Sequence, residues 1–252
     1  MSWWGKLFGG TFGFMLGGPL GALLGAALGH GLDNKAGQVY GRQRVQTAFF
    51  TATFSVMGHL AKADGRVSET EIQMARTLMD QMQLNPTLKK MAINLFNEGK
   101  ADDFALDDVL AQFKRECMRR HDLMRVFIEI QLQACYADGS LHQAEKKILL
   151  HVCQTLGFSR AEFDQIEAML RSGGARGGRG GGMLLDDAYK ILDVSKNATD
   201  AEVKKAYRRL MSQHHPDKLV AKGLPEEMMK IATEKTHEIR SAYELIKTDR
   251  GL

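Results

Sequence analysis

Cysteine and proline are scarce in this sequence, whose 252 residues include three cysteines and four prolines. The cysteines are odd in number and form no Cys-x-x-Cys pair, which argues against a disulfide framework and against a zinc ribbon. The sequence also lacks a phosphate-binding glycine loop, a nucleophile–base pair and a carboxylate dyad. We therefore expect a protein that is not an enzyme and that needs no cofactor.

One stretch lacks formal charge, because residues 7–32 contain no Asp, Glu, Lys or Arg. A helix of this length would extend roughly 39 Å, enough to cross the hydrocarbon core of a bilayer. Trp3 and Trp4 stand where an interfacial aromatic belt would lie. The alternatives are a buried helix or a cleaved signal peptide, but only Lys6 makes the start basic and the cleavage site is ambiguous. Residues 1–44 are thus predicted to form a membrane anchor, spanning about 7–32, and a juxtamembrane segment.

Glycine recurs at every fourth residue of this stretch, from Gly9 to Gly29. Each glycine in a helix in water is about 1 kcal/mol less favourable than alanine. In a membrane the same stripe lets two helix backbones approach closely. The spacing therefore predicts a homodimer formed through four glycines of the transmembrane helix, Gly13, Gly17, Gly21 and Gly25.

Residues 45–171 have helical periodicity, with breaks at Asn85-Pro86, Gly99 and Gly157. Within this block the segment 59–71 recurs as 133–145. Each copy has the pattern of a helix, then Ala-Asp-Gly-x-(Val/Leu)-x-x-x-Glu, then a second helix. This doubled pattern resembles the TerB-like, or tellurite-resistance, helical domain, which implies a helical bundle.

The acidic residues of the two repeats form a candidate metal site, because a pseudo-twofold arrangement would bring the two loops together. The four residues are Asp64, Glu71, Asp138 and Glu145. Carboxylate ligands would suit calcium or magnesium. Two other interpretations stay open: Asp-Gly is an ordinary turn, and the glutamate can cap the following helix.

Residues 172–182 consist almost entirely of glycine, arginine and serine. This composition predicts a flexible coil with a root-mean-square reach of roughly 20 Å. The few arginines are too sparse to indicate nucleic-acid binding, so we interpret the segment as a tether.

Residues 183–252 carry the most specific pattern in the chain. Thr199 and Glu202 form a capping box that starts a helix ending near His214. A short helix capped by Asp186 is expected before it, and Pro225 is expected to open a long helix after it. The apolar stripe of the long helix is Met228, Ile231, Ala232, Ile239, Ala242, Tyr243 and Ile246. Between the two long helices lies His-Pro-Asp.

This order of motifs resembles the J-domain of DnaJ-like co-chaperones, over about Leu184 to Thr248. The resemblance implies that the chain docks on a DnaK-type chaperone ATPase and stimulates ATP hydrolysis. The docking residues implied by the resemblance are His215, Pro216, Asp217, Lys204, Tyr207, Arg208, Arg209 and Lys218. A basic helix face would suit an acidic patch on such a partner.

Taken together, anchor, central block and J-domain resemble the membrane-anchored DnaJ-like co-chaperones, and they predict an all-α chain. Basic residues follow the anchor, which favours a single-pass protein of the bacterial inner membrane with its C-terminal domains in the cytoplasm. A partner that hydrolyses ATP also favours the cytoplasmic side for the C-terminal domains. The client would be an unidentified membrane or envelope protein. The alternative is an envelope sensor or scaffold, in which the TerB-like block binds a ligand or partner and the J-domain is accessory.

Overall fold

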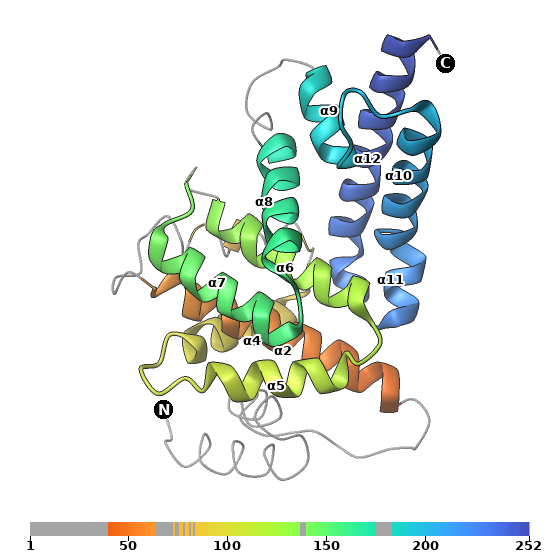
Figure 1. Cartoon of the computed structure of the whole chain (residues 1–252). Helices are drawn as coiled ribbons and strands as arrows, with labels where there is room; N and C mark the ends of the chain where they lie inside the picture. Colours follow the sequence, from red (N-terminus) through yellow and green to blue (C-terminus); the bar gives the residue numbers. More distant parts are fainter. Residues whose placement is uncertain are drawn as a thin grey trace.

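The computed structural model describes residues 40–63, 84–136, 140–174 and 183–251, with single positions between 73 and 82. Every element of regular secondary structure in these ranges is a helix, which confirms the predicted all-α class (Figure 1). Among the helices described, none has both the length and the apolar character to span a bilayer. The predicted anchor at 7–32 and its glycines Gly13, Gly17, Gly21 and Gly25 lie outside the described residues.

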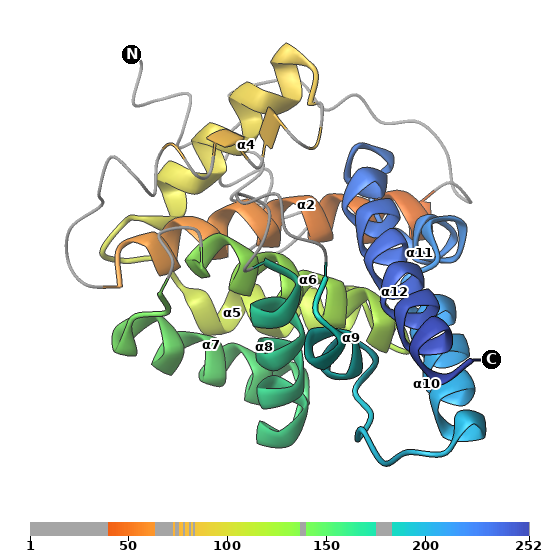
Figure 2. The same ribbon diagram turned by 90° about the horizontal axis from the view of Figure 1, so that it is seen from above.

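The central block is built around α2, whose residues 48–58 are all buried. Such a helix is apolar on most sides because other helices pack around it. In Figure 2, α2 crosses the block with α4 on one side and α5 and α6 on the other. The helices described in the block are α2 (Tyr40–Ala61), α4 (Pro86–Gly99), α5 (Leu106–Glu116), α6 (His121–Cys135), α7 (Gln143–Leu156) and α8 (Arg160–Gly174).

Two glycines allow α2 and α4 to touch backbone to backbone. A Cβ atom on Gly58 would overlap the carbonyl oxygen of Phe96, and one on Gly99 would overlap that of Ser55. A larger side chain at either position would force the helices apart, since backbone atoms cannot move aside as a side-chain tip can. The predicted helix break at Gly99 is confirmed, and the glycine there also permits interhelical contact.

Local signals placed several helix ends correctly. Asn85 caps α4 by accepting a hydrogen bond from the Leu88 amide at 2.9 Å. Gly157 ends α7 in the left-handed conformation, with φ of 91°. Ser159 and Glu162 form a reciprocal cap at the start of α8. These ends depend on neighbouring residues, which is why the sequence predicts them.

The C-terminal part contains α9 (Leu185–Leu192), α10 (Asp200–Gln213), α11 (Pro216–Lys222) and α12 (Met229–Arg250). The predicted capping box of Thr199 and Glu202 is confirmed. The predicted cap by Asp186 is wrong, because α9 has Leu184 at its N-cap and Asp186 instead pairs with Lys196 at 2.6 Å. A short 3₁₀ turn, η2 (Glu226–Met228), follows Pro225 before α12 begins.

The apolar stripe of η2 and α12 serves two separate cores. Met228 and Ala232 are buried in the core of the central block. Ile239, Ala242 and Ile246 are buried in the core that α9, α10 and α12 share. The C-terminal helices therefore pack directly on the central block, with α11 and the start of α12 beside the first turns of α2 (Figure 2). The segment 172–182 was interpreted above as a tether, but α8 continues through its first residues to Gly174. Residues 175–182 lie outside the described residues.

Candidate functional site

The His-Pro-Asp motif joins α10 to α11. His214 is the C-cap of α10 and His215 is the N-cap of α11, so the motif turns the chain from one helix into the next. Pro216 takes the first position of α11, where its missing amide hydrogen is not needed. His215 and Asp217 are exposed, and Asp217 makes no hydrogen bond or ion pair with other described residues.

Lys204 and Arg208 lie one turn apart on the exposed side of α10, and Ser212 follows at the same spacing. The Lys218 ammonium of α11 donates a hydrogen bond to the Ser212 hydroxyl at 2.7 Å. This contact places a third cation at the end of the row, next to Asp217. The predicted docking residues Lys204, Arg208 and Lys218 therefore share one face with the motif.

The two other predicted docking residues are in different surroundings. The ring of Tyr207 is half-buried and stacks on Tyr243 of α12, with centroids 4.2 Å apart. Arg209 points toward the end of α9, where its guanidinium lies 3.3 Å from the Asp193 carboxylate. An exposed pair of this kind contributes little to stability. Arg209 remains available to a partner, and Tyr207 supports the helix pair while part of its side chain stays accessible.

The residue just before the motif is buried against the central block. His214 is 1% exposed, and its Nε2 lies 3.0 and 3.1 Å from the two carboxylate oxygens of Glu129 in α6. Its Nδ1 lies 3.0 Å from the Leu210 carbonyl oxygen. Both ring nitrogens thus face oxygen acceptors. A histidine that donates from both nitrogens is an imidazolium cation, and in that form the ring makes a buried ion pair with Glu129.

Further charges surround Glu129. Arg125 Nε lies 3.2 Å from its carboxylate, and Lys235 of α12, which pairs with Glu238 at 2.8 Å, lies nearby. Burial alone would raise the pKa of the Glu129 carboxyl, but the neighbouring cations outweigh burial and lower that pKa to about 2. The carboxylate is therefore ionised at neutral pH and holds cations from both parts of the chain.

On the other side of the motif, α11 is also fixed to the central block. Leu219 and Leu224 are fully buried in the core of the central block. Lys222 pairs with Asp122 at the start of α6. Gly223 ends α11 with φ of 108° and lies directly against Val45 of α2. The exposed motif is thus held at both flanks by residues of the central block.

The candidate metal site falls largely outside the described residues, because Asp64, Glu71 and Asp138 lie there. Glu145 is buried, and its carboxylate accepts a hydrogen bond from the His142 amide at 2.9 Å at the start of α7. This is the capping interpretation left open above. No group of three or more potential metal ligands comes together within the described part of the chain.

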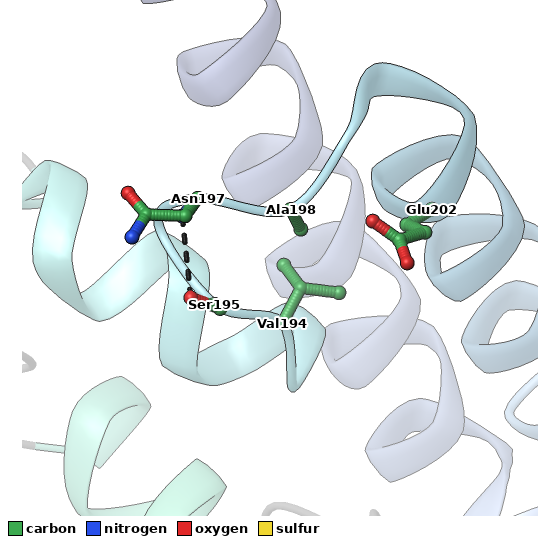
Figure 3. A pocket seen from close by; sticks show the side chains of 5 residues that line it. All are labelled: Val194, Ser195, Asn197, Ala198 and Glu202. Atoms are coloured by element: carbon green, nitrogen blue, oxygen red, sulfur yellow. Dashed lines mark hydrogen bonds between the residues drawn. The ribbon is translucent and has the colours of Figure 1, made fainter.

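A depression in the surface lies between α9 and α10, away from the motif (Figure 3). It is lined by Val194, Ser195, Asn197, Ala198 and Glu202. The carboxylate among them is already bound by the amide and hydroxyl of Thr199. The Ser195 hydroxyl accepts from the Asn197 amide at 3.2 Å. These polar groups stabilise the loop, and we assign no ligand to it.

The sequence did not indicate the contact between His214 and Glu129, nor the helix α11. The segment between the motif and Pro225 contains the apolar residues Leu219, Val220 and Leu224. Three such residues ahead of a glycine were the available signal for a short, partly buried helix. Nothing in the local pattern could have paired His214 with a glutamate 85 residues away.

Comparison with protein families divides the chain into three matched regions. Residues 1–45 match the model of the co-chaperone DjlA transmembrane domain, residues 50–168 that of the tellurite resistance protein TerB, and residues 187–250 that of the DnaJ domain. The predicted resemblances are thereby confirmed, and the first match supports the predicted anchor. No solved structure matches the chain significantly.

Curated relatives match over most of the chain. The co-chaperone protein DjlA of Photobacterium profundum is 45% identical and covers 98% of this chain and 99% of its own length. Those of Yersinia pestis and Escherichia coli K12 are each 47% identical. The alignment with the Yersinia pestis protein covers 83% of this chain and 82% of the relative, and the values for Escherichia coli are 82% and 81%.

Proposed function

Since this chain belongs to the family of DjlA co-chaperones, we propose that it recruits a DnaK-type chaperone ATPase and stimulates its ATP hydrolysis through His215-Pro216-Asp217. A co-chaperone regulates another protein's activity, in agreement with the expectation that this chain is not itself an enzyme. The proposed docking surface also includes Lys204, Tyr207, Arg208, Arg209 and Lys218.

The observation that carries this proposal is the exposed His-Pro-Asp turn beside a row of cations. Asp217 presents a short carboxylate that has no partner in the described chain, and it can therefore pair with a cation of the chaperone. Lys204, Arg208 and Lys218 present positive charge on the same face, which favours an acidic surface and speeds encounter with it. Catalysis would remain with the partner, and this chain would supply the contact.

The test is Asp217→Asn in the full chain, assayed by single-turnover ATP hydrolysis of a DnaK-type chaperone. Loss of a charge-assisted contact worth about 1.5–3 kcal/mol should weaken stimulation by roughly one to two orders of magnitude. Asp249→Asn is the matched control, because Asp249 is also an exposed carboxylate and lies near the far end of α12. Stimulation that is unchanged in the first variant would contradict the proposal.

The proposed setting is the bacterial inner membrane, with one transmembrane helix and the C-terminal domains in the cytoplasm. Support comes from the match of residues 1–45 to a transmembrane domain model and from the basic residues that follow residue 32. We propose that two copies associate through the glycines at 13, 17, 21 and 25. The client would be a membrane or envelope protein near this anchor.

A further inference from the structure

The central block holds the docking turn without covering it. His214 is fixed on one side by Glu129, and Leu219 is buried on the other side in the central core. Between these anchors, His215 and Asp217 remain exposed. Only four residues separate the two buried positions, so the path of the turn is closely determined by where the anchors sit.

Of these two contacts, the ion pair of His214 with Glu129 restricts the position of the turn more than the burial of Leu219 does. Its partners are 1% and 9% exposed, and each charge depends on the other for compensation. Removing one partner leaves an uncompensated charge away from water, whereas apolar contacts tolerate small displacements. Glu129 also forms an ion pair with Arg125, and both oxygens of its carboxylate face the His214 ring. The geometry therefore favours a single position of His214 relative to α6.

We propose that Glu129 is a positioning residue for the docking turn: through His214 it holds His215-Pro216-Asp217 in the orientation that meets the chaperone. The inference rests on the proposed function, because it concerns the efficiency of that contact. The TerB-like block would then have the role of orienting the docking turn of the J-domain. The same contact fixes the direction in which the motif faces relative to α2, the helix that follows the predicted membrane anchor.

The test replaces Glu129 with glutamine in the full chain, reconstituted in lipid nanodiscs. This change keeps the shape of the side chain and removes the charge that compensates His214. Single-turnover hydrolysis by a DnaK-type chaperone is measured over a range of co-chaperone concentrations. Fewer molecules should have the turn in its competent orientation, so the half-saturating concentration should rise about tenfold while maximal stimulation is retained.

Glu167→Gln is the matched control for the loss of a buried carboxylate. Glu167 is 9% exposed, pairs with Lys146 at 2.9 Å and accepts from the Tyr136 hydroxyl at 2.6 Å. These partners lie within the central block and do not touch the docking turn. Both variants should lose folding stability, but only Glu129→Gln should shift the half-saturating concentration. Equal shifts in the two variants would reduce Glu129 to a structural role and overturn the proposal.

Hydrogen exchange supplies a readout that does not depend on the chaperone. Amides of α11 should exchange faster in Glu129→Gln than in the unaltered chain, and at the original rate in Glu167→Gln. If the unaltered chain fails to stimulate hydrolysis, the proposed function fails. Exchange then still reports whether Glu129 holds α11. Unchanged exchange in Glu129→Gln overturns the positioning role by itself.

Should Glu129→Gln not fold, Asp122→Asn tests whether the central block positions the turn through another contact, the ion pair of Asp122 in α6 with Lys222 in α11. Asp122 is partly exposed and pairs with Lys222, so its loss perturbs folding less. The half-saturating concentration should again rise, with maximal stimulation retained. An unchanged concentration in this variant overturns the proposal.

Discussion

Replacing Gly223 with alanine should separate the docking segment from the central block. Gly223 ends α11 in the left-handed conformation, and its amide donates to the Val220 carbonyl at 3.0 Å. An added Cβ would lie 2.5 Å from Val45 Cγ1 and 2.9 Å from Val45 Cβ. Carbon atoms in contact normally lie about 3.5–4.0 Å apart. Either the end of α11 or the start of α2 must therefore move.

The expected loss of stability has two parts. A non-glycine residue in the left-handed region is destabilising by about 1–2 kcal/mol. Forcing a methyl group into a packed interface adds about 1–3 kcal/mol. Gly251→Ala separates these parts, because Gly251 also ends a helix in the left-handed region, with φ of 68°, but has no atom within 4 Å of an added Cβ. That control should show the first loss alone.

The measurement is the free energy of unfolding of the full chain, obtained by urea titration in nanodiscs. Gly223→Ala should be less stable than Gly251→Ala by about 1–3 kcal/mol. Adding Val45→Ala removes the nearer of the two overlapping atoms, so the double variant should lose less than the two single losses combined. Equal losses for the two glycine variants, or strict additivity with Val45→Ala, would refute this account of the interface.

Three more perturbations test separate features. Arg208→Glu should slow association with the chaperone and weaken its salt dependence, because exposed charges act mainly on encounter; stopped-flow rates that match the unaltered chain at low and high salt would contradict this. The pKa of Glu129 is lowered to about 2, below the unfolded value near 4.3, so its stabilisation is present above about pH 5 and lost as the pH falls toward 2. The stability difference between the unaltered chain and Glu129→Gln should accordingly shrink between pH 7 and pH 3, and a constant difference in thermal unfolding would oppose the assignment. Leucine at both Gly17 and Gly21 should abolish self-association of the transmembrane segment without preventing insertion, while Ala22→Leu should matter less; equal signals in a helix-association reporter would argue against the glycine interface.

The parts of the fold that sequence predicts are those decided by neighbouring residues. The capping box of Thr199 and Glu202, the cap at Asn85 and the glycine end at Gly157 involve contacts within a few positions. Asp186 shows the limit of such signals. An acidic residue near a helix start is favourable both as a cap and inside the first turn, so composition alone could not decide between the two.

The contacts that attach the docking turn to the central block could not be predicted in this way. The exposed residues of the motif, His215 and Asp217, belong to a recognisable pattern. Glu129 and Val45 are ordinary helix residues whose importance comes from distant partners. The stripe of α12 was correctly expected to be apolar, but a stripe does not reveal how many cores it enters. That depends on the position of α2 and α6, which only tertiary packing determines.

The sharing of one core between the two ends of the chain has a consequence for folding during synthesis. Val45 and Gly223 touch although 178 positions separate them, and Leu219, Leu224, Met228 and Ala232 complete the core around α2. At about 5–20 residues per second, a ribosome needs roughly 10–35 s to make the intervening segment. Throughout that interval the apolar side of α2 lacks its last covering. A nascent chain of this design therefore keeps part of its apolar surface exposed until its final helices emerge.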